Sequence, residues 1–289
     1  MVASIWAACA AKRDFTVATV PAWDVVQGMV LQPPEGSSDG ERRRFEEGWQ
    51  NLRQGNLEQA SSDLAGLASR FARSPEIATA NGFVELRLGN SMAAERYFRA
   101  ALKERPSYGP AQSGYFLTAL ATGDEESAYN RLEKLRQGYP QHPLVDRYAA
   151  TLQVNVAEKR LSAARNLRQQ NRYEEAAAAY LRALAVAPEV SGLYLEAAEA
   201  ELAAGLTKRA AVHARKATEL APEESSAYRL LGEAQYAAGD LAGAFEAYRV
   251  AFSLSPQDRR FGSVSKPSRP STTPRTCHPS ISGLPSPTG

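Results

Sequence analysis

Prolines return at one fixed step along this chain. Pro106 and Pro140 are 34 residues apart, and the same step separates Pro188 from Pro222 and Pro222 from Pro256. A fixed period of this length indicates one supersecondary unit that is stacked repeatedly, because a single unit cannot bury its apolar face alone. Such an array seldom carries a catalytic centre of its own, so its function depends on the surface that it offers to a partner.

Three columns of the repeat have a clear physical reason. When each proline is taken as position 32, position 15 holds glycine or asparagine, which suits a chain leaving a helix in the left-handed conformation. Alanine at position 20 lets two antiparallel helices approach closely, larger residues at position 24 fill the gap toward the next unit, and the proline ends the second helix. The columns are Gly89, Gly123, Asn171, Gly205 and Gly239; Ala94, Ala128, Ala176, Ala210 and Ala244; and Phe98, Leu132, Tyr180, Ala214 and Tyr248.

Four segments carry the pattern most clearly, and they resemble the tetratricopeptide repeat family. They are GNSMAAERYFRAALKERP, NRYEEAAAAYLRALAVAP, GLTKRAAVHARKATELAP and GDLAGAFEAYRVAFSLSP. The resemblance covers residues 41–258 and implies an all-α fold, a right-handed superhelical solenoid of about six stacked antiparallel helix pairs. A generic alanine-rich helix bundle is the alternative, but a bundle has no reason to repeat at 34 residues.

The repeat frame divides the chain into segments. The spacing between Pro140 and Pro188 exceeds one period by 14 residues, close to four helical turns, so 143–170 is either one long helix or two helices that meet near Asn155. The tail is rich in Ser, Pro and Thr, and we expect it to be disordered, either as a linker or as the product of a shifted reading frame. The predicted segments are 1–31 (apolar and irregular), 32–40 (linker), 41–142 (units 1 to 3), 143–156 (insertion or lengthened helix), 157–258 (units 4 to 6) and 259–289 (tail).

Residues 1–31 raise the question of a lipid anchor. Ala-Ala-Cys-Ala around Cys9 resembles the end of a bacterial lipoprotein signal, but only eight residues precede Cys9 and none of them is basic. Two interpretations stand: the true start lies upstream and Cys9 is lipidated on an envelope protein, or this is an ordinary buried or frayed N-terminus of a cytoplasmic protein. One acyl chain alone would give only marginal membrane binding.

Charge and chemistry exclude several functions. The net charge is +2, and removing the five positive charges of 259–289 leaves −3 for residues 1–258, which disfavours a nucleic-acid-binding array. Two cysteines cannot form a disulfide framework or a thiolate zinc site, and the three histidines share no metal-ligand spacing. The sequence has no nucleophile–base arrangement and no phosphate-binding loop. We therefore expect no enzyme activity, no cofactor and no metal.

The resemblance also implies where a partner would bind. In this family, positions 2, 5, 9 and 12 of each first helix line the concave groove. That placement makes the first three units apolar and aromatic and the last three mixed and arginine-rich. The implied partner-binding residues are Phe45, Trp49, Phe83 and Leu117, followed by Arg165, Arg168, Arg229 and Tyr236.

Each half of this groove has a competing interpretation. The aromatic residues could instead be buried by the apolar segment 11–31, and the arginines could be solvated or paired with nearby glutamates. Repeats that clamp acidic chaperone C-termini carry Lys at position 5 and Asn at position 9. Here those positions are Phe45 and Trp49, or Leu161 and Arg165, so that clamp is not expected.

Three functions remain. The first is a non-catalytic scaffold that binds a peptide or helix of a protein partner in the concave groove, in bacterial envelope assembly if Cys9 is lipidated. The second is the repeat portion of a larger enzyme or signalling protein whose C-terminal domain is missing. The third is a helical-repeat nucleic-acid binder, which the acidic body and the absence of regular base-reading pairs disfavour.

Overall fold

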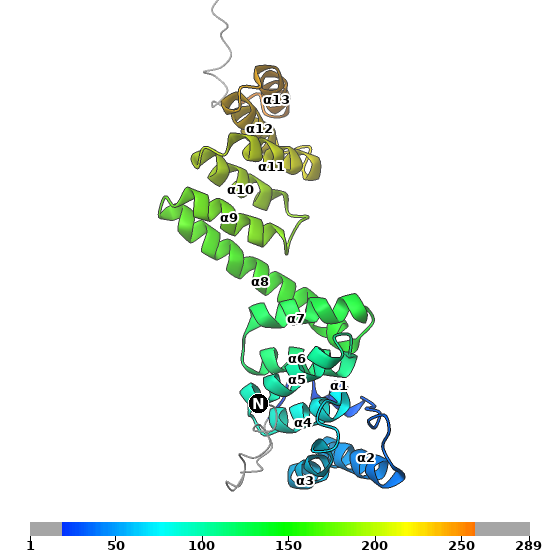
Figure 1. Ribbon diagram of the computed structural model, residues 1–289. Helices are drawn as coiled ribbons and strands as arrows, with labels where there is room; N and C mark the ends of the chain where they lie inside the picture. The colour runs from blue at the N-terminus through cyan, green and yellow to red at the C-terminus, as the bar shows by residue number, and fades with distance from the viewer. Residues whose placement is uncertain (1–18, 258–289) are drawn as a thin grey trace, which may run out of the picture.

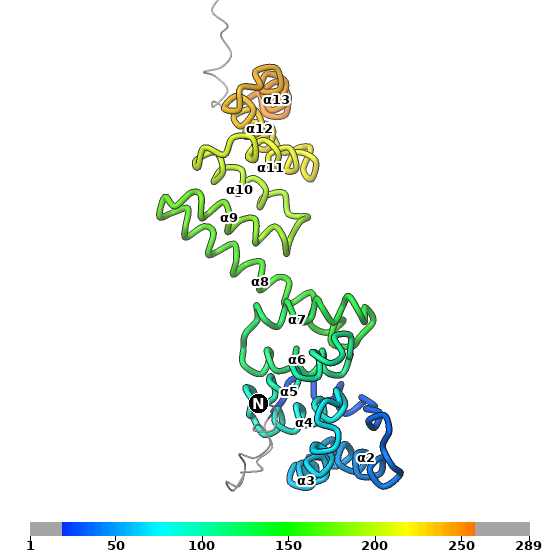
Figure 2. The backbone as a smooth tube through the Cα atoms, in the orientation of Figure 1, coloured from blue at the N-terminus to red at the C-terminus, as the bar shows by residue number. Residues whose placement is uncertain are grey.

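A computed structural model describes residues 19–257 of the chain. Cys9 and the tail 259–289 lie outside these described residues. Within them the chain is an elongated all-α array of antiparallel helix pairs, and the long helix α8 connects the two ends of the array (Figures 1 and 2). The prediction of a stacked helical solenoid is confirmed.

Thirteen helices make up the described residues, and a short helix, α1 (Trp23–Gln27), precedes the first pair. The pairs follow in chain order, with each second helix packed against the first helix of the next unit. They are α2 (Asp39–Gln54) with α3 (Leu57–Ala68), α4 (Pro75–Arg87) with α5 (Ser91–Glu104), α6 (Gly109–Ala121) with α7 (Glu125–Gly138), α8 (Pro143–Gln169) with α9 (Tyr173–Leu184), α10 (Ser191–Ala203) with α11 (Thr207–Leu220), and α12 (Ser225–Ala237) with α13 (Leu241–Leu254).

The turn inside each pair has the conformation that the glycine column predicts. Every residue at position 15 has a positive φ, and the only non-glycine among them, Asn171, has a φ of 58°. Asparagine tolerates this region better than other residues with a side chain. The left-handed residue ends the first helix and reverses the chain in a few residues, which sets the antiparallel geometry of all six pairs.

The alanine column packs as expected. Each alanine at position 20 is buried at the contact between the two helices of its unit. The residue at position 24 then reaches toward the following unit. Phe98 on α5 shows this best, because its ring fills the space between Gly82 of α4 and Gly114 of α6. A Cβ added to Gly82 would lie 2.7 Å from the Phe98 ring, so the two glycines make room for one large side chain.

Helix α8 accounts for the irregular step in the proline spacing. It is one continuous helix through Asn155 and is 27 residues long. Its N-terminal half contributes Leu144, Val145 and Leu152 to the core of the first three pairs. Its C-terminal half contributes Ala164 to a separate core that it shares with α9 and α10. The extra turns therefore join two hydrophobic cores rather than forming a unit of their own.

We expect Gly114→Ala to lower the free energy of unfolding by about 1–3 kcal/mol, because the new methyl group would overlap the buried Phe98 ring. Gly192→Ala is the matched control, since Gly192 is also in a helix and has no atom within 4 Å of an added Cβ. The control should be neutral, or more stable by about 0.5–1 kcal/mol. Urea unfolding followed by circular dichroism measures both variants, and equal effects would contradict the packing described for Phe98.

A second prediction concerns the start of α8. The backbone N–H of Leu144 donates to Nδ1 of His142 at 3.2 Å, and burial lowers the pKa of His142. The folded state thus favours the neutral imidazole, so its contribution to stability is present above the ordinary histidine pKa and is lost as pH falls through the lower, folded value. We expect wild type to lose thermal stability between about pH 7.5 and about pH 5.5, and His142→Asn, which keeps a capping acceptor, to lose clearly less. Equal losses in the two proteins would show that another group is responsible.

Candidate partner-binding surface

The aromatic residues proposed for the first half of the groove are buried. Phe45 and Trp49 lie on α2, Phe83 lies on α4 and Leu117 lies on α6, and all four side chains belong to one hydrophobic core. Phe83 stands at the centre of this cluster, 5.7 Å from Trp49 and 5.0 Å from Phe98 between ring centroids. In this structure these four residues line no open groove and offer no surface to a partner.

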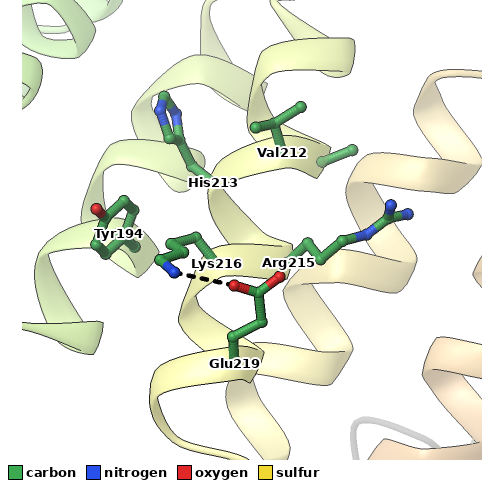
Figure 3. A pocket seen from close by; sticks show the side chains of 7 residues that line it. Tyr194, Val212, His213, Arg215, Lys216 and Glu219 are labelled. Atoms are coloured by element: carbon green, nitrogen blue, oxygen red, sulfur yellow. Dashed lines mark hydrogen bonds and ion pairs between the residues drawn. The ribbon is translucent and has the colours of Figure 1, made fainter. Parts of the chain in front are cut away.

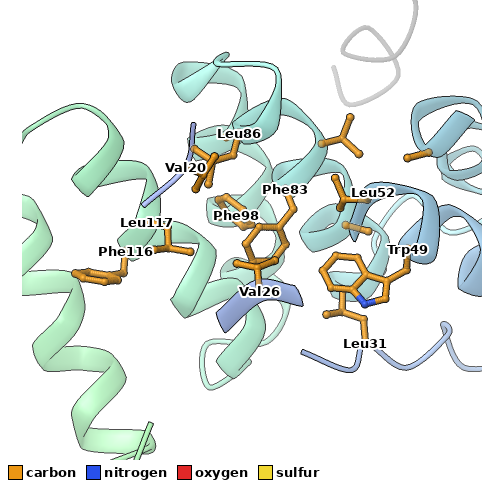
Figure 4. Close-up of a cluster of buried hydrophobic side chains, with 14 of the residues drawn as sticks. Val20, Val26, Leu31, Trp49, Leu52, Phe83, Leu86, Phe98, Phe116 and Leu117 are labelled. Atoms are coloured by element: carbon orange, nitrogen blue, oxygen red, sulfur yellow. The ribbon is translucent and has the colours of Figure 1, made fainter. Parts of the chain in front are cut away.

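The chain's own N-terminal segment covers them. We call residues 19–31 the N-terminal strap; it includes α1 and contacts Trp49 of α2 and Phe83 of α4. Figure 4 shows Val26 of the strap against Phe83 and Leu31 against Trp49. Val20, Val26 and Leu31 are all buried in the same core, and Trp23 meets the edge of the Phe83 ring at 6.2 Å. The strap thus covers the face that the sequence analysis assigned to the first half of the groove.

Polar contacts hold the strap at both ends. The indole N–H of Trp49 donates to the carbonyl of Met29 at 3.2 Å, and Arg53 donates to the carbonyl of Gln27 at 3.2 Å. Arg147 of α8 binds both carboxylate oxygens of Asp24 at 2.7 and 2.8 Å. The hydrogen bond from Arg147 lowers the pKa of Asp24. Helix α1 therefore contacts residues from both ends of the first core.

The residues that the sequence analysis assigned to the second half of the groove are mostly charged and at least partly exposed. Two arginines of α8 bind glutamates of α10: Arg165 Nε lies 2.9 Å from Glu196, and Arg168 lies 2.8 Å from Glu199. We call these two ion pairs the arginine ladder. Each pair joins the first helices of neighbouring units, and both arginines remain partly exposed. Arg165 and Arg168 thus agree with the alternative interpretation of the sequence, in which the arginines pair with nearby glutamates. Both side chains still remain partly exposed to solvent.

A buried tyrosine supports one rung of the ladder. The hydroxyl of Tyr180 on α9 donates to Glu196 at 2.9 Å. Burial, together with this hydrogen bond, raises the pKa of Tyr180 to about 12. The hydrogen bond from Arg165, with that from Tyr180, lowers the pKa of Glu196. The carboxylate is therefore ionised at neutral pH and fixes the Arg165 guanidinium.

The remaining proposed residues continue this face onto α12. Arg229 pairs with Glu233 one turn later on the same helix. Tyr236 is 64% exposed, an unusual value for a large aromatic side chain. Beside the ladder, on α8, lies a hollow of about 520 Å³. Its lining residues are Glu158, Leu161, Ser162, Arg165, Asn166 and Gln169.

Sequence reasoning missed a column of buried polar residues at position 11. Glu85, Glu201 and Gln235 are all buried at this position. Glu201 lies 2.7 Å from Nδ1 of His213, and Asn90 donates to Glu85 at 2.9 Å. Glu201 and Gln235 are 34 residues apart, and Glu85 has the same position within its own unit; this recurrence was the available signal.

A second hollow lies outside the groove. It has a volume of about 360 Å³ and lies between Tyr194 of α10 and the exposed side of α11 (Figure 3). Val212, His213, Lys216 and Glu219 form much of its wall, and Lys216 pairs with Glu219 at 3.0 Å. Across residues 19–257, no cluster of three side chains has the composition and geometry of a metal site. None of the helices described has both the length and the apolar character needed to cross a bilayer.

The chain is similar to one family of repeats and to several solved structures. A family model for the tetratricopeptide repeat matches residues 161–223 and 195–259. Similar solved structures include YrrB, described as a repeat protein with an unusual peptide-binding site, at 12% identity, covering 70% of this chain and 96% of its own, with a TM-score of 0.36. The TPR2AB domain of yeast Sti1, solved in a complex titled with pHSP90, matches at 14% identity, 79% and 95% coverage and a TM-score of 0.37. MamA from Desulfovibrio magneticus RS-1 matches at 19% identity, covering 76% of this chain and 98% of its own, with a TM-score of 0.31. No curated protein matches the sequence.

The described residues thus define an α-solenoid built from helix pairs, a class of protein that presents extended surfaces to other proteins. The matched segments place the chain more narrowly. Residues 161–259 match the tetratricopeptide repeat model, so this part of the chain contains tetratricopeptide repeats. Its repeats support a role in protein interaction.

The N-terminal strap leads to a stability prediction. Trp49→Ala removes a buried indole from the core under the strap, and we expect it to cost about 3–5 kcal/mol of unfolding free energy. Arg147→Ala should change stability little, because the ion pair with Asp24 is exposed to solvent. Chemical denaturation of the full chain measures both. A Trp49→Ala protein as stable as wild type would mean that the strap does not pack on this core.

Proposed function

We propose that the protein is a non-catalytic scaffold that binds a partner peptide or helix on the concave face of units 4 to 6. The arginine ladder and Tyr236 form this face. The partner segment carries acidic side chains together with an apolar or aromatic one, which matches the guanidinium groups of the ladder and the exposed ring of Tyr236. Units 1 to 3 present their corresponding face to the strap, so the proposal assigns partner binding to the second half of the array.

The arginine ladder is the observation that carries this proposal. A guanidinium has five N–H donors, and Glu199 engages one terminal nitrogen of Arg168. The glutamates hold the planar groups in a fixed orientation, so less side-chain entropy is lost when a carboxylate binds the remaining donors. The hollow beside Arg165 gives an adjoining apolar or aromatic side chain a place to bind.

An envelope role depends on Cys9, which lies outside the described residues. Metabolic labelling with a palmitate analogue tests it, with Cys9→Ser as the control. Label that persists in Cys9→Ser, or no label in wild type, would remove the envelope role and leave the binding proposal unchanged.

The binding proposal is tested with a phage-displayed random peptide library on the full-length protein. We expect enrichment of peptides with Asp or Glu beside an aliphatic or aromatic residue. Arg168→Glu should weaken the selected peptide at least about tenfold, equivalent to about 1.4 kcal/mol, as measured by fluorescence anisotropy. Tyr236→Ala should weaken it by about fivefold or more, within the range of a single interface aromatic residue.

Arg172→Glu is the control for charge reversal. Arg172 lies in the turn after α8, outside the ladder, and pairs with Glu175 at 2.6 Å. It should bind the selected peptide as wild type does. Peptides that bind Arg168→Glu and Tyr236→Ala with unchanged affinity would place the binding surface elsewhere.

A further inference from the structure

The N-terminal strap packs on the first core, but its backbone is strained at one point. Ala22, which precedes α1, has a φ of 52° and lies in the left-handed region. In this region the Cβ of a residue lies too close to the following carbonyl oxygen. The turns inside the helix pairs reach the same region with glycine or, at Asn171, with asparagine. Among residues 19–257 an alanine takes this conformation only in the strap, so a segment with glycine there would bind the same face more tightly.

The indole N–H of Trp23 is a second unfavourable feature of the strap. Its Nε1 atom is buried, and no described residue accepts a hydrogen bond from it. The ring itself is well placed, since its centroid lies 6.2 Å from that of Phe83 and 4.5 Å from the guanidinium carbon of Arg87. A buried N–H without an acceptor costs free energy that a ring of the same shape without the N–H would not. The face under the strap therefore fits the shape of Trp23 but not its hydrogen-bond donor.

The strap contacts this face as a short linear ligand would. Its anchors are buried apolar side chains (Figure 4), two of its backbone carbonyls accept hydrogen bonds from α2, and one carboxylate binds Arg147 of α8. None of these contacts requires the segment to belong to the same chain. The anchors are Val20, Val26 and Leu31, the carbonyls are those of Gln27 and Met29, and the carboxylate is that of Asp24.

We propose that this face is a second binding site, which the strap keeps closed and which a segment of a partner protein opens by displacing the strap. The segment has apolar residues at the places of the three anchors, an acidic residue opposite Arg147, and glycine or asparagine where the strap has Ala22. The site lies in the first block and does not use the arginine ladder. The array thus has two separate surfaces for partners.

The two unfavourable features explain how a separate segment can compete with a tethered one. The strap is part of the chain, so its effective concentration at this face is high, and a free segment of equal intrinsic affinity would hardly displace it. The strain at Ala22 and the unpaired N–H of Trp23 lower the intrinsic affinity of the strap. A segment without them regains that difference. Backbone strain of this kind is typical of switch regions.

Fluorescence anisotropy tests the proposal with the full-length protein and a labelled peptide of residues 19–31. Ala22→Gly is made in each of them in turn. In the peptide it should tighten binding by about threefold or more, because glycine adopts the left-handed conformation without strain. In the protein it should weaken binding of the unchanged peptide by about the same factor, because the strap then leaves the face open for less of the time. A peptide bound anywhere else would not respond to the change in the protein.

A variant that loosens the strap should have the opposite effect. Val26→Asp removes a fully buried anchor, and this protein should bind the unchanged peptide at least about tenfold more tightly than wild type does. Thermal unfolding shows whether the variant is folded. If it is not, Ala22→Gly still tests the proposal, because it keeps every side-chain contact of the strap.

Two further variants serve as controls. Ala203→Gly makes the same change at an exposed alanine that ends α10, and it should bind the peptide as wild type does. Arg168→Glu should also leave binding of this peptide unchanged, because the arginine ladder is not part of the site. Failure of this proposal and failure of the one for units 4 to 6 are therefore separate results.

Three results would overturn the proposal. The first is a peptide that binds neither wild type nor Val26→Asp at about 1 mM, the effective concentration of a segment on a short flexible linker. The second is equal affinity of the unchanged peptide for wild type and for the Ala22→Gly protein. The third is a wild-type dimer in sedimentation velocity that the peptide dissociates, because the strap of a second copy would then occupy the face.

Discussion

The constraint that governs this structure is that a helix pair of the repeat cannot bury its second helix alone. Ala94, Ala128 and their equivalents are buried inside each unit. At position 24, Phe98 and Tyr180 also contact the next unit. Phe98 reaches between two glycines on neighbouring first helices and shows how closely the units interlock. Each unit is therefore stabilised by its neighbours. Where the regular stacking is interrupted or a neighbour is missing, the exposed apolar surface must be buried in another way.

Three such solutions differ along the chain. At the N-terminal block the strap covers the concave face with Val20, Val26 and Leu31. In the middle, α8 is long enough to belong to two cores at once. At α13 no helix among residues 19–257 covers Phe245, which is 66% exposed. The requirement for burial is thus met by the strap at the first units and by α8 between the two blocks, whereas α13 keeps apolar side chains exposed.

Much of the fold was predictable because the repeat is periodic. The glycine and asparagine column foretold the left-handed turns, and the alanine column foretold the buried contacts. The strap was harder to place, since its contacts join residues as distant as Asp24 and Arg147, and no local pattern encodes such a pair. For Trp49 and Phe83, the sequence showed that they share a face but not whether that face is open. Apolar residues look the same in a groove and in a core.

For the arginine residues, the sequence predicted the positions but not the ion-pair partners. Their positions on the first helices followed from the repeat frame, whereas the partners of Arg165 and Arg168 depend on how far α10 is rotated against α8. Because α8 is one rigid helix, Arg147 at the strap and Arg165 at the ladder lie 18 residues apart on it, about 27 Å along the axis at 1.5 Å per residue. The two blocks have separate cores, and α8 contributes residues to both, so it links the covered half of the array to the open half.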